Sequence, residues 1–310
     1  MRLGWWIGVA ALFGSGSAQA AACRLGPAGT TVPVAIEGTG RSMLVHVPAG
    51  RSAARLPLVF VFHGSTGKGR DILAQSKLEA TADRHGFLLA APDGGIPAEK
   101  GFVWNIPGVP TVTGKIPGPE DAGDVAFVQS AIDQLAAKGC VDRSRVYATG
   151  YSGGGRMTSW LGCVAADRFA AIAPVVGLRA GNPLKETPRV PDPATCTPSR
   201  PMPVLAFAGD ADTTNPIQGG GAGYWQYTMH TALVRWADLN GCRVGPVERE
   251  VSAEVKEERF SRCSGRADVA GRVKHGAGHV WVADNEAMWA FFARHRRRDA
   301  IRMDRSKGSR

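Results

Sequence analysis

Apolar runs alternate with helical patterns along this chain, and the alternation limits the folds open to it. Leu58–Phe62 is a continuous apolar run typical of a buried central strand, and a helical pattern over Ile72–His85 follows it. We expect further strands at residues 43–47, 87–92, 145–149, 170–176, 204–208 and 268–274, and helices through 125–135 and at 153–163, 224–239 and 285–297. This order predicts right-handed crossovers and a mostly parallel sheet with helices on both faces.

One α/β domain over residues 21–297 accounts for all of these elements. The 310 residues are 44% hydrophobic and 21% charged, which is enough apolar material for a large core. Neither an internal repeat nor a linker marks a second module. Whether the irregular stretch Asp93–Pro119 is a lid stays open.

The first twenty residues have the pattern of a cleavable secretory signal. Arg2 precedes an apolar run from Leu3 to Phe13, and Ala18-Gln19-Ala20 forms an A-x-A cleavage site. A lipoprotein signal ending at Cys23 is the alternative. No later segment approaches the roughly 20 apolar residues of a membrane span. We therefore expect a secreted protein, either extracellular or periplasmic.

Six cysteines form an even set, which in an exported chain favours disulfides over metal thiolates. No pair has the C-x-x-C spacing of a zinc site. Cys242 and Cys263 flank a segment with alternating valines, which predicts a disulfide across a hairpin. The sequence leaves three ways to pair the other four, which are Cys23, Cys140, Cys163 and Cys196.

The net charge of +10 is concentrated at one end of the chain. Residues 294–310 hold eight Arg or Lys against two Asp, and residues 298–310 form a basic tail. A short basic tail is typical of a solvated end, so we expect no nucleic-acid partner.

Gly150-x-Ser152-x-Gly154 stands where a strand pattern changes to a helix pattern. This spacing fits a nucleophile elbow, a tight turn that presents a serine hydroxyl above the sheet. A purely structural glycine-rich turn is the alternative. In the elbow architecture an acid and then a histidine follow the serine along the chain.

His279, in the segment "HGAGHVW" 127 residues after the serine, is the favoured base. It follows a late strand in a glycine-containing loop, whereas His275 lies nearer the strand and is the weaker candidate. The loop after residues 204–208 supplies two aspartates, Asp210 and Asp212, of which Asp212 is favoured as the acid.

The oxyanion of the tetrahedral intermediate needs two backbone N–H donors. We expect one from Gly153, directly after the serine, and the other from Ser65 or Thr66 in the loop after "LVFVFHG". His63 is interpreted as structural, shaping that loop. The mechanism requires no metal and no organic cofactor.

With these residues placed, the chain resembles the secreted feruloyl esterases and poly(3-hydroxybutyrate) depolymerases, α/β-hydrolases related to the first family of carbohydrate esterases. The resemblance covers residues 40–292 and rests on "PLVFVFHGSTG", "CVDRSRVYATGYSGGGRM", "DRFAAIAPVVG", "CTPSRPMPVLAFAGDADTTNP", "WADLNGC" and "HGAGHVW". It implies a single α/β-hydrolase domain with Ser152 as nucleophile, Asp212 as acid and His279 as base. Ala208 replaces the family's usual histidine and Asp210 its threonine, which keeps Asp210 open as the acid.

The resemblance implies a serine carboxylic-ester hydrolase, with hydroxycinnamoyl esters of plant polysaccharides as the first substrate class and hydroxybutyrate oligomers as the second. Tyr151, Trp104 and Trp281 are candidates for an aromatic substrate slot, and core packing is the alternative for each. Soluble or oligomeric esters are expected over a crystalline polymer. A non-catalytic protein that binds an envelope polymer is the competing class of function. The sequence leaves the oligomeric state open.

Overall fold

The structure is a computed structural model that describes residues 23–50 and 55–297. The expected signal at residues 1–20 and the basic tail at residues 298–310 lie outside the described residues. Within them, no helix is both long and apolar enough to cross a membrane.

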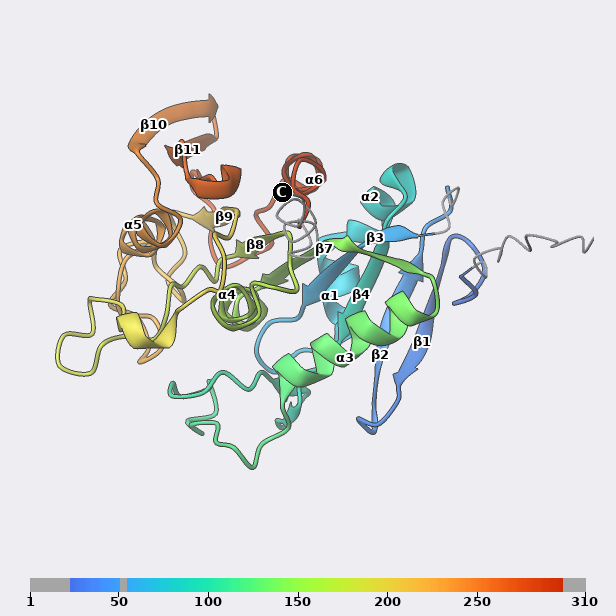
Figure 1. The fold of residues 1–310 in the computed structure, drawn as a ribbon. Helices are drawn as coiled ribbons and strands as arrows, with labels where there is room; N and C mark the ends of the chain where they lie inside the picture. The colour runs from blue at the N-terminus through green and yellow to red at the C-terminus, as the bar shows by residue number, and fades with distance from the viewer. Residues whose placement is uncertain (1–22, 51–54, 298–310) are drawn as a thin grey trace, which may run out of the picture.

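Strands and helices alternate through the middle of the chain (Figure 1). In chain order the elements are β1 (Thr30–Ile36), β2 (Arg41–Val47), β3 (Leu56–Phe62), α1 (Gly69–Ser76), α2 (Leu78–His85), β4 (Leu88–Pro92), β5 (Ile96–Pro97), β6 (Phe102–Val103), α3 (Asp124–Ala137), β7 (Val141–Tyr151), α4 (Gly153–Val164), β8 (Ala171–Val175), β9 (Val204–Gly209), α5 (Met229–Leu239), β10 (Val244–Ser252), β11 (Val255–Ser261), β12 (Val269–Lys274) and α6 (Asn285–Ala293). Two short 3₁₀ turns lie at Pro193–Thr195 and Ser264–Arg266.

The central sheet has ten strands in the order β1-β2-β4-β3-β7-β8-β9-β12-β11-β10. The six strands from β4 to β12 in this order run parallel to one another, and the pairs at both margins are antiparallel. The mostly parallel sheet predicted from the sequence is confirmed. Its parallel centre matters for function because the carboxyl ends of parallel strands gather loops at one edge.

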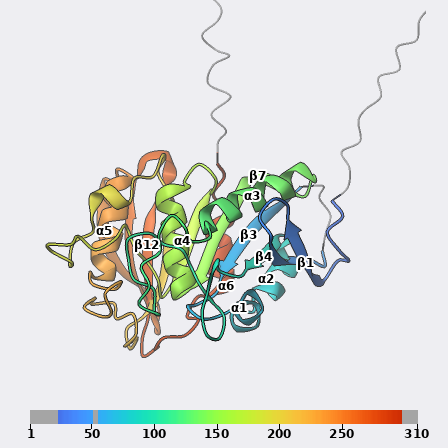
Figure 2. The same cartoon turned by 90° about the horizontal axis from the view of Figure 1, so that it is seen from below.

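Helices cover both faces of this sheet (Figure 2). On one face α3 and α4 pack against alternate side chains of β3 and β7, including Phe60, Phe62 and Ala148, and α5 packs against β12. On the other face α1, α2 and α6 pack against Val59, Val61 and their neighbours. Every residue of β3 is buried, which explains its continuous apolar sequence.

The helix predicted over Ile72–His85 is wrong in one respect, because the structure has two helices there. Lys77 adopts a left-handed conformation with φ 55°, which ends α1 and begins α2. The helices expected at 224–239 and 285–297 are shorter than expected, since α5 begins at Met229 and α6 ends at Ala293. The first strand, β1, was not predicted; it pairs with β2 at the margin of the sheet.

Three disulfides join the six cysteines. They are Cys23–Cys140, Cys163–Cys196 and Cys242–Cys263. The last is the pair expected across a hairpin, and it closes the base of β10 and β11. The other two are pairings that the sequence left open.

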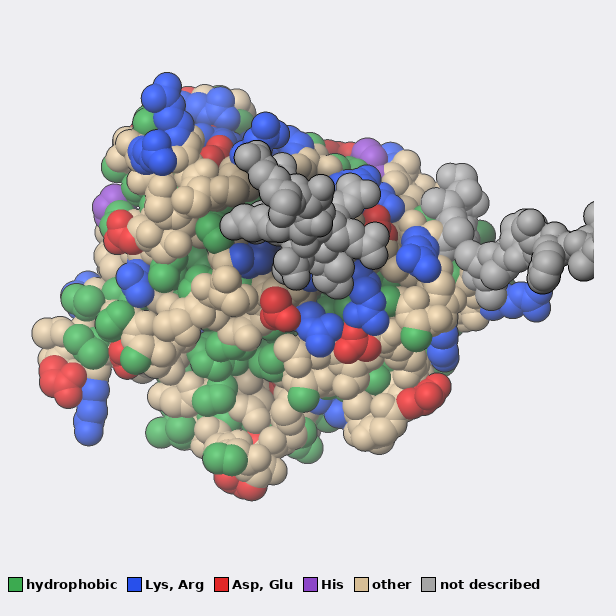
Figure 3. All heavy atoms as spheres, in the orientation of Figure 1, with side chains coloured by type: hydrophobic (Ala, Val, Ile, Leu, Met, Phe, Trp, Pro, Cys, Tyr) green, Lys and Arg blue, Asp and Glu red, His purple; other side chains and the backbone are tan. Residues whose placement is uncertain are grey.

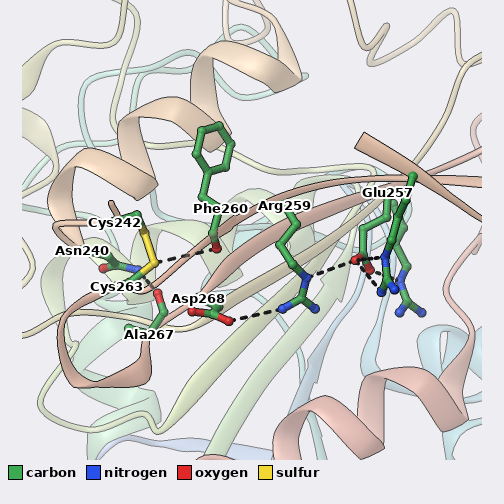
Figure 4. A network of polar contacts seen from close by, with 10 residues as sticks. Asn240, Cys242, Glu257, Arg259, Phe260, Cys263, Ala267 and Asp268 are labelled. Carbon is green, nitrogen blue, oxygen red and sulfur yellow. Dashed lines mark hydrogen bonds and ion pairs between the residues drawn. A yellow bond between two sulfur atoms is a disulfide. The ribbon is translucent and has the colours of Figure 1, made fainter. Parts of the chain in front are cut away.

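The β10–β11 hairpin is built around a buried carboxylate (Figure 4). Glu257 is fully buried and accepts hydrogen bonds from the side chains of Arg249, Arg259 and Arg272. Although burial opposes ionisation, these three arginines lower the pKa of Glu257 to about 2. Lys and Arg side chains also gather on the surface where this hairpin lies (Figure 3). In this hairpin the negative charge of buried Glu257 therefore compensates part of the positive charge of the arginines around it.

Candidate active site

The turn between β7 and α4 presents Ser152 in a strained backbone conformation. Its φ is 53° and its ψ is −113°, a combination that non-glycine residues rarely adopt. The neighbouring glycines let the turn pack closely: a Cβ on Gly154 would lie 2.1 Å from the carbonyl oxygen of Phe62. Ser152 precedes α4 at the N-cap position, yet its side chain makes no capping bond. The hydroxyl is therefore free to bond elsewhere.

Ser152, His279 and Asp212 form one chain of hydrogen bonds. The Oγ of Ser152 lies 2.8 Å from Nε2 of His279, and Nδ1 of the same ring lies 2.7 Å from Oδ2 of Asp212. A carboxylate only accepts hydrogen bonds, so Nδ1 carries the proton and Nε2 is left to accept the serine proton. This is the arrangement that activates a serine for attack on a carbonyl carbon.

Adjacent parallel strands bring the acid and the histidine together. β9 precedes Asp212 and β12 precedes His279, and these two strands are paired directly. The two loops then touch, since the N–H of Ala211 donates to the carbonyl oxygen of Ala277. Gly209 is needed at this contact, because a Cβ there would lie 2.1 Å from that same oxygen.

Asp212 is fixed by its own loop. It is 3% exposed, and its Oδ1 accepts hydrogen bonds from the backbone N–H groups of Thr214 and Asn215 at 2.9 and 2.8 Å. The side chain of Asn215 in turn donates to the carbonyl oxygen of Val176, at the end of β8. The sequence analysis missed Asn215, whose only signal was its place three residues after the acid.

Asp210 and His275 form a separate pair. Asp210 accepts hydrogen bonds from Nδ1 of His275 at 2.9 Å and from the N–H of Gly276 at 2.7 Å. The hydrogen bond that His275 donates to Asp210 raises the pKa of His275, and the same contact lowers the pKa of Asp210. Neither residue touches Ser152, so the geometry favours Asp212 over Asp210 and His279 over His275.

Gly153 and Ser65 lie against each other beside the elbow. A Cβ on Gly153 would be 2.8 Å from the backbone nitrogen of Ser65. Within the described part of the chain neither backbone N–H has a hydrogen-bond partner, so both are available to an oxyanion. The N–H of Thr66 instead donates to the carbonyl oxygen of Phe102 at 2.8 Å. Of the two alternatives from the sequence, the geometry therefore favours Ser65 and opposes Thr66.

His63 and Trp104 hold the loop that carries Ser65. The N–H of Gly94 donates to Nε2 of His63, so Nδ1 bears the proton and donates to the carbonyl oxygen of Gly64. Burial lowers the pKa of His63, which keeps this ring neutral. Trp104 is 3% exposed and donates from Nε1 to the carbonyl oxygen of His63. Of the two roles weighed for Trp104, core packing is the one that the structure has.

Tyr151 is half-buried beside the histidine. Its ring centroid lies 5.1 Å from that of His279, and its hydroxyl donates to the backbone carbonyl oxygen of His279. Trp281 is also half-buried and donates to Oδ1 of Asn285, on the first turn of α6. Tyr151 thus borders the serine and holds the histidine loop, a contact that the sequence did not reveal.

In the described residues, no group of three or more His, Cys, Asp or Glu side chains is placed to hold a metal ion. The chemistry that these side chains themselves offer is nucleophilic attack with general base assistance.

The comparisons with known proteins match this chain to esterases. Residues 41–190 match the family model described as esterase PHB depolymerase. Feruloyl esterase B of Piromyces equi is 30% identical over 260 residues, which cover 81% of this chain and 44% of that protein. Putative esterase NocK of Nocardia uniformis subsp. tsuyamanensis is 33% identical over 239 residues, covering 76% of this chain and 60% of that protein. The chain therefore spans 44% and 60% of the lengths of these two relatives.

Among solved structures, an acetyl xylan esterase from Aspergillus awamori superimposes on this chain with a TM-score of 0.59. The superposition covers 85% of this chain and 99% of that one, at 15% sequence identity. At this identity the likeness concerns the fold alone, which is that of an α/β-hydrolase.

Proposed function

Since this chain belongs to the α/β-hydrolase family of feruloyl esterases and poly(3-hydroxybutyrate) depolymerases, we propose that it hydrolyses carboxylic esters through a serine acyl-enzyme. The observation that carries the proposal is the hydrogen-bonded chain from Ser152 through His279 to Asp212. A serine held in a strained turn, with no capping bond and with an acceptor nitrogen at 2.8 Å, has the geometry of an activated nucleophile.

In the proposed reaction Ser152 attacks the ester carbonyl carbon while Nε2 of His279 takes its proton. Asp212 accepts the hydrogen bond that Nδ1–H of His279 donates, and it stabilises the imidazolium that forms. The N–H groups of Gly153 and Ser65 bind the oxyanion of the tetrahedral intermediate. Collapse expels the alcohol, which takes the proton from His279, and leaves an acyl-serine. A water that gives its proton to His279 then attacks the acyl-serine and releases the acid.

Esters of hydroxycinnamic acids with plant polysaccharides are the substrates we propose first. The support is the similarity to a relative named feruloyl esterase, together with the half-buried ring of Tyr151, the residue directly before the serine. Hydroxybutyrate oligomers are the second candidate, favoured by the match of residues 41–190 to the depolymerase model. We propose soluble or oligomeric forms of either ester as substrates, and residues 21–297 as the catalytic domain that cleaves them.

We also propose that the protein is exported, either to a periplasm or outside the cell. The three disulfides support this, since such bonds persist in oxidising compartments. The signal pattern at residues 1–20 supports it as well.

A Ser152→Ala variant tests the proposed reaction. With p-nitrophenyl acetate, methyl ferulate and a hydroxybutyrate trimer as substrates, we expect kcat/KM to fall by about 10⁴ or more for whichever esters the unaltered protein cleaves. Ser252→Ala, at the exposed last residue of β10, is the matched control and should leave all rates unchanged. Turnover that survives in Ser152→Ala would contradict the serine mechanism, and an unaltered protein that cleaves none of these esters would support the non-catalytic alternative. Cleavage of the trimer alone would favour the depolymerase activity.

A further inference from the structure

Two buried arginines near the serine have no acidic partner. Arg156 is 8% exposed and Arg179 is 7% exposed. Among the described residues, neither makes an ion pair with an Asp or Glu side chain. Buried charges in proteins are normally paired, because removing a charge from water without compensation is costly.

Arg156 lies on the first turn of α4, four residues after the serine. Its backbone N–H donates to the carbonyl oxygen of Ser152, and its Nη2 lies 3.4 Å from the Oγ of Ser65. The guanidinium stacks over the ring of Tyr224, with Cζ 3.9 Å from the centroid. Its Nε is buried and makes no hydrogen bond within the described chain. Stacking stabilises the cation but leaves this donor unsatisfied.

Arg179 reaches the same region from the loop after β8. Its backbone N–H donates to Oγ of Ser159, and its carbonyl oxygen accepts a hydrogen bond from Trp236, which fixes the backbone. Its guanidinium lies over the ring of Tyr227, at 4.4 Å from the centroid. Its Nη1 is buried and likewise lacks a hydrogen-bond partner in the described part of the chain.

Both side chains stay charged at neutral pH. Burial lowers the pKa of Arg156 to about 10, and it lowers the pKa of Arg179 as well. The fold therefore maintains two positive charges against the tendency of burial to neutralise them. The contrast with the β10–β11 hairpin is direct, because there a buried Glu257 receives hydrogen bonds from three arginines.

The two arginines line one recess. Its other walls include apolar and amide side chains, and its cavity volume is about 20 Å³, which is room for a group of about the size of a carboxylate. The lining residues besides the arginines include Ile106, Val109, Trp160, Asn182 and Tyr224. Arg156 connects this recess to the proposed oxyanion site, since the same guanidinium approaches Ser65.

We propose that this recess, the Arg156–Arg179 recess, binds a carboxylate carried by the ester substrate, so that the protein selects anionic esters over neutral ones. The inference rests on the proposed ester hydrolysis and names its substrate class more narrowly. A carboxylate offers acceptors for the unsatisfied Nε and Nη1 donors and compensates both charges. The rings of Tyr224 and Tyr227 hold the two guanidinium planes in place for it.

The experiment measures binding to the Ser152→Ala protein, which requires no turnover. Methyl 4-carboxybenzoate and its 3-carboxy isomer carry a carboxylate on the acyl side, and 4-acetoxybenzoate carries one on the alcohol side. The matched neutral ligands are the carbamoyl analogues of the same three esters. By calorimetry at pH 7 we expect at least one anionic ester to bind about tenfold or more tightly than its neutral analogue. Equal affinity within every pair, or no binding by any of the six, would overturn the inference.

Variants at a second site test whether the preference for anionic esters arises in the Arg156–Arg179 recess. Arg156→Met and Arg179→Met, each made in the Ser152→Ala protein, should abolish the preference for the anionic ester. The conservative Arg179→Lys should retain part of it, and it keeps the test decisive if the methionine variants do not fold. Arg70→Gln is the control, because the side chain of Arg70 is 72% exposed on α1. A preference that persists unchanged in the arginine variants would contradict the assignment.

The two proposals fail in different ways. If the protein with Ser152 intact cleaves neutral and anionic esters equally and Ser152→Ala cleaves neither, ester hydrolysis stands and the anionic preference is rejected. If Ser152→Ala binds the anionic ester selectively but the unaltered protein cleaves none, the recess stands and the esterase proposal is rejected.

Discussion

The phenolic hydroxyl of Tyr151 donates a hydrogen bond of 2.6 Å to the backbone carbonyl oxygen of His279. The residue directly before the candidate nucleophile therefore holds the loop that carries the candidate base. Burial raises the pKa of Tyr151, so its hydroxyl remains a donor at neutral and mildly alkaline pH.

Replacing Tyr151 by phenylalanine should slow turnover without unfolding the protein. Loss of one neutral hydrogen bond of about 0.5–1.5 kcal/mol corresponds to a decrease in kcat of roughly 2- to 10-fold, with little change in KM. Steady-state kinetics with methyl ferulate or p-nitrophenyl acetate check this. Tyr147→Phe is the matched control, since Tyr147 bonds the carbonyl oxygen of His295 far from the site. Equal rates for the Tyr151 and Tyr147 variants would contradict the positioning role.

The two aspartates after β9 should differ sharply when each is changed to asparagine. Asp212→Asn is expected to lower kcat by about 10⁴, because an amide in place of the carboxylate favours the wrong tautomer of His279. Asp210→Asn should stay within a few-fold of the unaltered protein, because Asp210 bonds His275 and Gly276 instead. Measuring kcat for both variants with one substrate decides the acid. A larger loss in Asp210→Asn would reverse the assignment.

Adding one methyl group at Gly153 should block the proposed oxyanion site. A Cβ there would lie 2.4 Å from Oγ and 2.8 Å from the backbone nitrogen of Ser65. We expect Gly153→Ala to lower kcat by about 10²–10³, the usual effect of losing an oxyanion donor. Gly123→Ala is the control, since its Cβ would meet only Ala126 at 3.6 Å. Unimpaired turnover in Gly153→Ala would show that the oxyanion is bound elsewhere.

Folding stability should fall as the pH drops from 6.5 toward 4. Burial, together with the charges of Arg294 and Arg200, lowers the pKa of His295 to about 4. Since this folded-state pKa lies below the unfolded value of 6.5, the unfolded chain takes up the proton first, and stability is lost across that interval. Buried His63 acts in the same direction, and exposed His275, whose pKa is raised, acts in the opposite one.

Thermal midpoints between pH 4.5 and 7.5 test this linkage. The variant His295→Gln should show a weaker dependence on pH than the unaltered protein, because it removes one proton-binding group from the unfolded chain. His230→Gln, whose side chain is 58% exposed, is the control. An unchanged slope in His295→Gln would exclude His295 as the cause.

The central strands and the order of the site residues were open to prediction because their signals are local. The continuous apolar run of β3 and the glycines around Ser152 can be read without knowing the partners of either segment. The break at Lys77 was not open to prediction in the same way. No glycine or proline marks it, and the left-handed residue is tolerated because both short helices bury apolar side chains against the sheet.

The other features that could not be predicted from the sequence depend on contacts between distant segments. The choice of Ser65 over Thr66 depends on the carbonyl oxygen of Phe102, which takes the N–H of Thr66. The choice of Asp212 over Asp210 depends on which histidine of the loop after β12 each carboxylate contacts. The Arg156–Arg179 recess combines a helix and a loop, and no motif in the sequence marks either arginine as buried.

The disulfides have a consequence for biosynthesis. In order of synthesis each cysteine is joined to the one that follows it, Cys23 to Cys140, Cys163 to Cys196 and Cys242 to Cys263. In the export proposed above, a chain that crossed the membrane from its N-terminus would therefore deliver its thiols in the order in which they pair. Oxidation of the thiols in that order would produce the final connectivity without isomerisation of a wrong pair.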